Sequence, residues 1–282
     1  MRLRLLGLAL LATAAANGAL AQGKKYETLK LASEGAYAPW NFTTAGGKLD
    51  GFEIELGNDL CARMKVKCEF VAQDWDGIIP ALNARKYDAI MAGMSITEKR
   101  MEVISFSAPY ANAPNGILVE KSSPLAKLPG TGQRFSLDRQ EAEAQKAIDA
   151  IKPALKGKTI GVQGSTTHAA FADKYLKGTI ELREYKSTEA HDLDLGAGRI
   201  DGVIADSTTL NGTREKPEFK DYVIAGPGFT GGVLGNGVGI GLRKDDTELK
   251  SMFDEAIKAA IADGTVKRLS EKWFKVDTTP QG

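Results

Sequence analysis

Apolar side chains along the chain follow two spacings, one typical of helices and one typical of buried strands. One helical stripe has an apolar residue at every fourth position: Phe52, Leu56, Leu60 and Met64. Short apolar runs at 28–32, 68–71 and 87–91 predict strands around this helix and around a second helix that begins near Ile78. The alternation of strands and helices favours a parallel sheet with helices on both faces.

A similar series returns in the second half of the chain. Strands are predicted at 158–162, 180–184 and 202–205, again with helical patterns between them. Two units of the same kind indicate two lobes. The segment between them, residues 122–156, is polar, contains several Pro and Gly residues and has a helical pattern over 140–151. We expect it to be an insertion on the surface.

The stretch that follows the strand at 87–91 carries the most suggestive chemistry. It reads Ala92-Gly93-Met94-Ser95-Ile96-Thr97-Glu98-Lys99-Arg100. Small residues at a strand end let another molecule approach the backbone, and serine, threonine and arginine supply hydrogen-bond donors that fit a carboxylate. The alternative is a helix N-cap followed by a solvated basic end.

Three further loops lie at predicted strand ends, where α/β proteins bind ligands. The loop from Glu34 to Trp40 combines a carboxylate with Tyr37, but both aromatic residues could instead plug the edge of the core. Gly164-Ser165-Thr166-Thr167 begins a helix, whose N-terminal N–H groups suit an anion, although such turns are common and no P-loop spacing is present. Asp206 follows the last strand and could be a ligand contact or a solvated acid.

The N-terminus predicts export. Arg2 and Arg4 precede an apolar run over 5–16, and Ala19-Leu20-Ala21 forms a small-x-small cleavage site, so residues 1–21 are expected to be a cleaved signal peptide. An uncleaved anchor is the alternative. The destination expected is a bacterial periplasm, and no later run is long enough to span a bilayer.

Composition narrows the choice of partners and cofactors. The net charge is +1 and falls to −1 once the two leader arginines are removed, which argues against a nucleic-acid binder. In an exported chain the two cysteines, Cys61 and Cys68, are expected to form a disulfide. With these and only His168 and His191, the sequence offers no ligand spacing for zinc or iron, and no cofactor is predicted.

The chain resembles periplasmic solute-binding proteins of the importers for polar amino acids. The resemblance covers nearly the whole mature chain and includes the signature segment Gly51-Phe52-Glu53-Ile54-Glu55-Leu56 with Leu60-Cys61. The 94–100 stretch and the cysteine pair are similar to the lysine/arginine/ornithine and histidine binders. The 122–156 insertion, the 162–167 stretch and Lys272-Trp273-Phe274-Lys275-Val276-Asp277 look more like the octopine and nopaline binders.

That resemblance implies an α/β, two-lobed type II periplasmic binding protein fold with two hinge crossovers. The first lobe would comprise residues 24–113 and 237–282, and the second lobe residues 114–236. Each lobe would hold a mostly parallel sheet flanked by helices. The protein would be a monomer that captures a small amino acid or opine and delivers it to the membrane permease of an ATP-driven (ABC) importer.

The resemblance also assigns expected roles in the cleft. Arg100 would bind the ligand α-carboxylate with Ser95 and the Thr166 region, and Asp206 would bind the α-ammonium. Tyr37 and Trp75 would enclose the aliphatic stem, and Glu34 would pair with a distal cation. The expected ligand-binding set is Glu34, Tyr37, Trp40, Trp75, Ala92, Gly93, Met94, Ser95, Arg100, Gly164, Ser165, Thr166 and Asp206.

Two departures leave the ligand open between a cationic amino acid and a guanidino opine. Ala92 and Gly93 stand where the basic amino acid binders carry serines, which suits a bulkier ligand. Asp206 stands where some opine binders carry a neutral amide, and an acid favours a full ammonium. His168 is expected to be structural or to lie at the rim of the pocket.

Two other classes of function were weighed. Dehydratases that act on small carboxylates resemble this family, and an exported enzyme of that kind would need a general acid or base, for which Glu34 and His168 are the candidates. A sensor's ligand-binding domain is disfavoured because neither a membrane span nor a signalling domain follows. We expect a binding protein and no catalytic residues.

Overall fold

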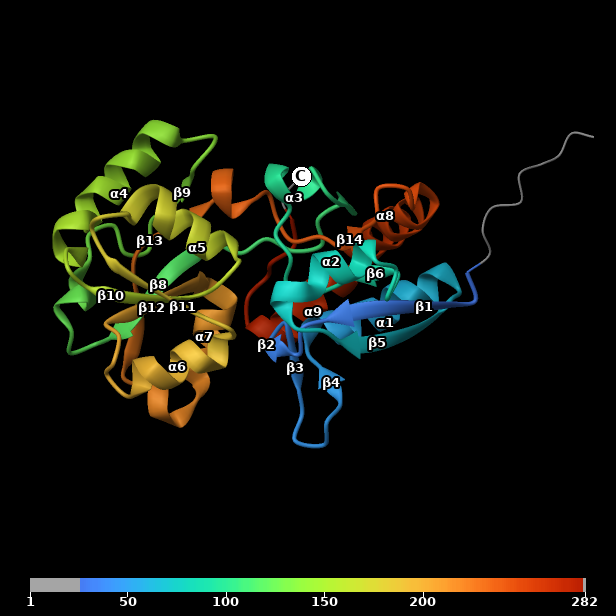
Figure 1. The fold of residues 1–282 in the computed structure, drawn as a ribbon, viewed down its shortest axis with the longest axis horizontal. Coiled ribbons are helices and arrows are strands. Elements are labelled where there is room, and N and C mark those ends of the chain that lie inside the picture. The colour runs from blue at the N-terminus through green and yellow to red at the C-terminus, as the bar shows by residue number, and fades with distance from the viewer. Residues whose placement is uncertain (1–25, 281–282) are drawn as a thin grey trace, which may run out of the picture.

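The computed structural model describes residues 26–280, so the expected signal peptide lies outside the described residues. The described chain forms two large sheets, each wrapped by helices, and one small sheet (Figure 1). Strands of the first large sheet come from residues 28–106 and 241–242, and those of the second from residues 115–230. We refer to the two halves as the first lobe and the second lobe; the exact boundaries between them stay a prediction.

The first sheet has the strand order β5-β1-β6-β14-β7. Its strands are β1 (Thr28–Ser33), β5 (Lys67–Ala72), β6 (Ala89–Ile90), β7 (Ser105–Phe106) and β14 (Gly241–Leu242). β1 pairs in parallel with β5 and β6, as the strand–helix–strand order predicts. β14 is antiparallel to β6 and β7, because the chain enters it on returning from the second lobe. The sheet is therefore mixed.

Helices cover both faces of the first sheet. They are α1 (Phe52–Met64), α2 (Ile78–Asn83), α3 (Glu98–Met101), α8 (Thr247–Ala262) and α9 (Thr265–Phe274). Phe52, Leu56 and Leu60 are fully buried against α8, α9 and the sheet, which confirms the predicted stripe. A small sheet of β2 (Ala36–Tyr37), β3 (Asn41–Thr43) and β4 (Leu49–Asp50) projects from this lobe (Figure 1).

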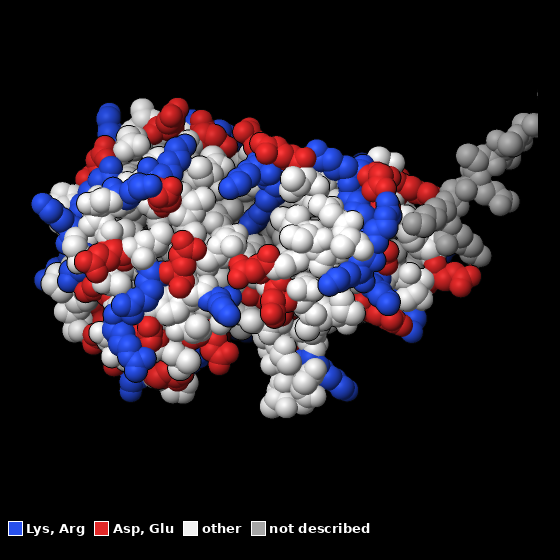
Figure 2. All heavy atoms as spheres, viewed as in Figure 1, with Lys and Arg blue, Asp and Glu red and all other residues white. Residues whose placement is uncertain are grey.

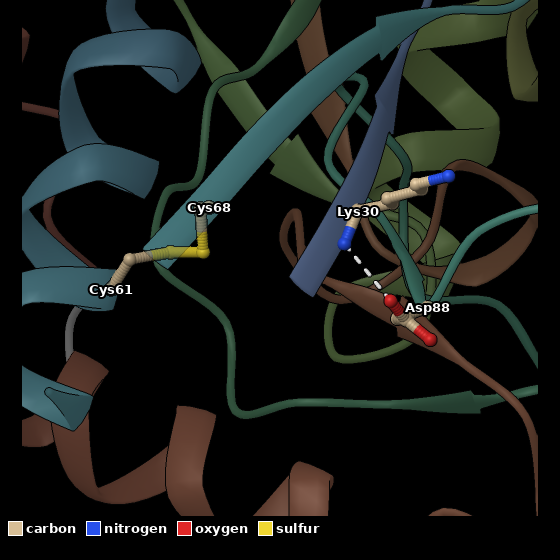
Figure 3. The surroundings of a disulfide bond; sticks show 4 residues. All are labelled: Lys30, Cys61, Cys68 and Asp88. Atoms are coloured by element: carbon tan, nitrogen blue, oxygen red, sulfur yellow. Dashed lines mark hydrogen bonds between the residues drawn. A yellow bond between two sulfur atoms is a disulfide. The ribbon is translucent and has the colours of Figure 1, made fainter. Parts of the chain in front are cut away.

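The predicted disulfide between Cys61 and Cys68 is present and joins α1 to β5 (Figure 3). Beside it, the backbone N–H of Lys30 donates to the Asp88 carboxylate at 2.9 Å. Cys68 pairs with Leu29 near the start of β1, whereas Glu34 follows the other end of β1. The disulfide therefore lies at the end of the sheet opposite to Glu34.

The second sheet has the strand order β11-β10-β12-β8-β13-β9. Its strands are β8 (Asn115–Glu120), β9 (Arg134–Ser136), β10 (Thr159–Gln163), β11 (Glu181–Tyr185), β12 (Gly202–Asp206) and β13 (Tyr222–Thr230). β10, β11 and β12 run parallel, while β8 is antiparallel to both β12 and β13. Its helices are α4 (Glu141–Leu155), α5 (Thr167–Phe171), α6 (Thr188–Gly196) and α7 (Ser207–Glu215).

The segment 122–156 differs from the expected surface insertion. Its strand β9 joins the edge of the second sheet by pairing with β13. Its helix α4 buries a stripe made of Ala144, Ile148, Ile151 and Leu155 in the core of the lobe. These positions repeat at helical spacing, so the segment covers one face of the sheet although most of its other side chains are polar.

The exposed side chains of the protein are of mixed charge. Figure 2 shows Lys and Arg interspersed with Asp and Glu over the visible face of both lobes. Within residues 26–280, no helix combines the length and the apolar character needed to cross a bilayer. The same part of the chain contains no cluster of three or more His, Cys, Asp or Glu side chains that could hold a metal ion.

Candidate ligand-binding site

Two adjoining cavities, of about 420 and 290 Å³, lie in the cleft between the lobes. They share four residues at their junction: Tyr37, Gly93, Ser95 and His168. The larger cavity is also lined by Trp40, Asn112, Ala113, Asn115, Asp206, Thr230, Leu234, Gly235, Gly237 and Val238. The smaller cavity is also lined by Glu34, Trp75, Ala92, Arg100, Gln163, Thr166 and Thr167. Ten of the thirteen residues expected from the sequence therefore line this cleft.

Arg100 lies in the smaller cavity on the short helix α3. The Thr97 hydroxyl caps this helix by accepting from the Arg100 backbone N–H at 3.2 Å. The guanidinium donates from Nη1 to the Ser95 carbonyl at 2.8 Å and stacks 5.1 Å from the centre of the Trp75 ring. Burial lowers the pKa of Arg100 to about 10, so it stays charged at neutral pH. No ion pair among residues 26–280 uses this guanidinium, which leaves it able to bind an anion.

Glu34 lies opposite, on the loop after β1. Its Oε1 accepts a hydrogen bond of 2.5 Å from Gln163 Nε2 in the second lobe. Burial raises the pKa of Glu34 to about 7, and the negative charge of Glu53 adds to this shift. A carboxylate in this position favours a cationic partner, because a cation would stabilise its ionised form.

Asp206 ends β12 and caps α7. Its Oδ1 accepts from the backbone N–H groups of Thr208 and Thr209, each at 3.0 Å, and from Trp40 Nε1 at 3.2 Å. The Tyr37 hydroxyl donates to Oδ2. Both aromatic residues belong to the first lobe, so the carboxylate is held from both sides of the cleft. Trp40 is 1% exposed and packs in the core of its own lobe while its Nε1 reaches the cleft.

His168, expected to be structural or to lie at the rim, is buried where the two cavities meet. Its Nε2 lies 2.7 Å from Asn115 Oδ1, which is an acceptor, so the neutral ring carries its proton on Nε2. Burial lowers the pKa of His168 to about 4. The ring is therefore neutral at physiological pH and offers its other nitrogen as an acceptor.

Gly93 is required by the neighbouring aromatic ring. Its φ is +60°, and a Cβ at this position would lie 3.2 Å from the Tyr37 ring. The small side chain was expected to make room for a bulkier ligand. The structure shows that Tyr37 occupies the space next to it.

Three expected residues lie outside the two cavity linings. Met94 is fully buried in an apolar cluster of the first lobe, while its neighbours Gly93 and Ser95 line the cleft. Gly164 and Ser165 belong to the turn that leads to Thr166. This turn takes part through its backbone, since the Ser165 carbonyl accepts from Trp75 Nε1 at 3.2 Å. Thr166 caps α5, since its hydroxyl accepts from the Ala169 backbone N–H.

Several lining residues were missed by the sequence reasoning. Asn112, Asn115 and Thr230 lie on or next to the two segments that connect the lobes. These segments come together through the bridge between Ala111 and Val238. Their polar and glycine-rich character was the available signal, but only the packing of the two lobes brings them to the cleft.

Hydrogen bonds link the lobes directly across the cleft. Besides the contacts of Glu34, Trp75 and Asp206, the Thr188 hydroxyl donates to the Ala36 carbonyl at 3.0 Å. The two lobes are therefore closed around the cavities.

Comparison with known proteins is consistent across sequence and structure. Residues 29–276 match the family described as bacterial extracellular solute-binding proteins, family 3. The chain is 50% identical to the octopine-binding periplasmic protein of Rhizobium meliloti, over 90% of this chain and 92% of that protein. It is 36% identical to the L-arginine-binding protein of Pseudomonas aeruginosa, over 88% of each chain. A solved ancestral amino acid-binding protein, described as a precursor of cyclohexadienyl dehydratase, matches with a TM-score of 0.71 and 29% identity, over 88% of this chain and 95% of that one.

Proposed function

Because the chain belongs to family 3 of the bacterial extracellular solute-binding proteins, we propose that it binds a guanidino opine in the cleft between its lobes. It then acts in the periplasm as the ligand-binding component of an ATP-driven importer and presents the opine to the membrane permease. An opine of the octopine type is an arginine whose α-nitrogen carries a second arm with its own carboxylate. The ligand therefore has a guanidinium, a secondary ammonium and two carboxylates.

The smaller cavity suits the arginine part of such a ligand. Arg100 has no acidic partner among the described residues and supplies the donors for the α-carboxylate, while the Ser95 carbonyl holds its guanidinium in place. Glu34 offers a carboxylate for the distal guanidinium. Trp75 and Tyr37 line the same cavity and would cover the aliphatic stem between these two charges.

The hydrogen bonding of Asp206 carries the choice of an opine over a free amino acid. Each oxygen of a carboxylate has about two acceptor positions, and Oδ1 of Asp206 is fully occupied by the backbone N–H groups and the hydroxyl at the start of α7 and by Trp40. Oδ2 accepts from the Tyr37 hydroxyl, which leaves one position on this oxygen for the ligand. A primary ammonium has three N–H donors and a secondary ammonium has two, so the opine leaves fewer donors unpaired.

The larger cavity suits the second arm. It begins at the junction formed by Tyr37 and His168 and extends toward the segments that connect the lobes. Asn112 lines it, and its side-chain amide is a neutral donor for a carboxylate. Asn115 also lines it and has one N–H left, since its Nδ2 already donates to the Phe229 carbonyl at 3.1 Å. A free amino acid would reach the larger cavity only with its ammonium, at Asp206, and would leave the rest of this space to water.

The second candidate is a free cationic amino acid such as arginine, lysine or ornithine. It is favoured by net charge, because Arg100, Glu34 and Asp206 together carry one negative charge, which a ligand with two cations and one carboxylate neutralises. The likeness to an L-arginine-binding protein supports it as well. Of the two candidate acid–base groups for catalysis, His168 is disfavoured because it has a pKa of about 4 and is bound to Asn115, which leaves Glu34, with a pKa of about 7.

Calorimetry on the purified protein decides between these ligands. We expect octopine to bind at least about tenfold more tightly than arginine, ornithine, lysine or histidine, since a poorly paired buried donor costs about 1–3 kcal/mol. If arginine binds most tightly, the second candidate, a free cationic amino acid, replaces the opine as the proposed ligand. No heat with any of them would reject both, and conversion of a small carboxylic acid would establish an enzyme.

The variant Arg100→Ala tests the orientation of the ligand. It should abolish binding of every ligand that carries an α-carboxylate, because that carboxylate would be buried without a partner. The control is Arg85→Ala, which removes an exposed arginine of the same lobe that pairs with Asp245, and it should leave binding unchanged. Affinity of Arg100→Ala within threefold of the unaltered protein would refute the role of Arg100.

A further inference from the structure

Glu53 is a fully buried carboxylate in the first turn of α1. No cation pairs with it among the described residues. Instead, three neutral donors surround it: the backbone N–H of Gly93 at 2.7 Å, the Asn41 side-chain amide at 2.7 Å and the Tyr110 hydroxyl. Such a group is costly to bury unless each oxygen is hydrogen-bonded, and these donors meet that requirement.

The donors lead to both ligand-facing loops of the first lobe. Gly93 belongs to the loop of residues 92–95, which lines both cavities; we call it the Gly93 loop. Asn41 continues the chain of bonds, because its Oδ1 accepts from the backbone N–H of Gly35 at 2.7 Å. Gly35 follows Glu34 directly, so residues 34–36, the Glu34 loop, are connected to the same carboxylate.

The third donor connects this carboxylate to the region between the lobes. Tyr110 precedes the first connecting segment, and its backbone N–H donates to the Val238 carbonyl at 2.9 Å on the second connecting segment. Its side chain is fully buried and its hydroxyl donates to Glu53 Oε1, the same oxygen that accepts from Gly93. The Glu53 side chain is therefore hydrogen-bonded, directly or through Asn41, to both loops and to Tyr110 beside the segments that connect the lobes.

We propose that Glu53 is a positioning residue whose buried carboxylate, together with Asn41, holds both ligand-facing loops of the first lobe in place. Glu53 itself lines neither cavity, so it acts on the ligand only through the loops. The inference rests on the proposed function for the choice of ligand alone. The restraint on the loops exists in the protein whichever ligand it binds.

The variant Glu53→Gln breaks the arrangement without changing its shape. All three partners are donors, so one of them would face the glutamine NH₂ group and lose its acceptor. We expect the affinity for octopine to fall about tenfold or more by calorimetry. In the ligand-free protein, amide hydrogen exchange of peptides that cover residues 33–36 and 91–95 should become faster.

A second substitution should restore the pairing. In Glu53→Gln combined with Asn41→Asp, the glutamine amide donates to the new carboxylate, which still accepts from Gly35, while the glutamine carbonyl accepts from Gly93 and Tyr110. We expect affinity within threefold of the unaltered protein and slow exchange of both loops. A double variant as weak as Glu53→Gln alone would overturn the proposal.

The matched control is Asp246→Asn, which alters another buried carboxylate of the first lobe. Asp246 pairs with Arg243 at 2.6 Å, and Arg243 also donates to the carbonyl of Tyr87, before the start of β6 and far from the Gly93 loop. This variant should lower the melting temperature and leave both affinity and loop exchange unchanged. If Glu53→Gln behaves in the same way, Glu53 is only a core residue and the proposal is wrong.

Failure of the proposed function and failure of Glu53→Gln to fold are distinguished by separate measurements. If the unaltered protein binds neither octopine nor arginine, the proposed function fails, while the exchange of the ligand-free protein still tests Glu53. If Glu53→Gln does not fold, Asn41→Ala replaces it, since this variant removes the link to the Glu34 loop and the donor to Glu53 Oε2, while Gly93 and Tyr110 still donate to Oε1. Exchange should then rise at residues 33–36 and stay slow at 91–95, and an equal rise at both would contradict the proposal.

Discussion

Glu34 is the cleft residue whose charge changes near physiological pH. Burial raises its pKa to about 7, above the value of 4.5 for an exposed glutamate. The protonated form therefore predominates in the folded protein below pH 7, and the ionised form above it. A bound cation favours the ionised form, so ligand affinity should increase as the pH rises through this range.

We expect the affinity for a guanidino ligand to rise roughly eightfold between pH 6 and pH 7.5, which is the increase in the ionised fraction of a group with a pKa of about 7. Calorimetry at a series of pH values measures this dependence. Glu34→Gln should bind weakly at every pH and show a flat profile. His168 does not account for the effect, because its pKa of about 4 keeps it neutral throughout. A profile that persists in Glu34→Gln would assign the titration to another group.

Most residues that line the cleft were expected from the resemblance and from their position at strand ends. Glu34 and Asp206 line the cavities because each lies at the carboxyl end of a strand in its own sheet, and Arg100 lies on the short helix α3. Asn115 was missed because it begins an antiparallel strand, for which that rule does not hold. Met94 was expected in the cleft from the resemblance of its stretch to the basic amino acid binders, whereas its side chain is buried in the core of the first lobe.

At the scale of elements, α1 and β5 illustrate how local pattern and covalent chemistry act together. The apolar stripe of α1 buries three large residues, and the disulfide attaches its last turns to the next strand. The bond closes a short loop, with a sequence separation of 7 residues. Short loops lose little entropy in the unfolded chain, so the stabilisation is modest, about 2–3 kcal/mol.

Replacing both cysteines by serine should lower the free energy of unfolding by about 2–3 kcal/mol in urea titrations. Ligand affinity should stay within twofold, because the disulfide lies at the end of the sheet away from the Glu34 loop. The unaltered protein with reductant provides the control and should lose a similar stability. A large loss of affinity in the double serine variant would show that α1 transmits strain to the cleft.

The segment 122–156 shows where element prediction from composition fails. Its polar residues and its Pro and Gly content indicated the surface, yet the helix within it covers one face of the second sheet. The apolar stripe that begins at Ala144 predicts the burial of this helix, although most of its other residues are polar. Composition averages over a helix, whereas burial depends on one face of it.

At the scale of the whole molecule, the two-lobed type II fold is confirmed by the two separate sheets and by the solved structures that share it. The mixed direction of the strands could not be read from the strand–helix–strand order. It follows from the two crossings of the chain between the lobes, which deliver β8 and β14 in the opposite direction.

Contacts across the cleft also depend on how the two lobes pack against each other. Asp206 of the second lobe accepts from Tyr37 and Trp40 of the first. Gln163 of the second lobe in turn donates to Glu34 of the first lobe. None of these pairs is visible in the sequence, because each joins residues more than a hundred positions apart.

The hydrogen bond from Trp75 Nε1 to the Ser165 carbonyl makes the fluorescence of Trp75 sensitive to the opening and closing of the lobes. The indole is partly exposed and belongs to one half of the molecule, while its acceptor belongs to the other, so opening of the halves would release the ring into water. Tryptophan emission should therefore shift to shorter wavelength on addition of octopine or arginine, and Trp75→Phe should lose most of that shift. Trp273, which donates to Glu55 within the first lobe, serves as the silent chromophore, and Trp273→Phe should keep the full response. Stopped-flow recording of this signal would give the rate of closure without any attached dye.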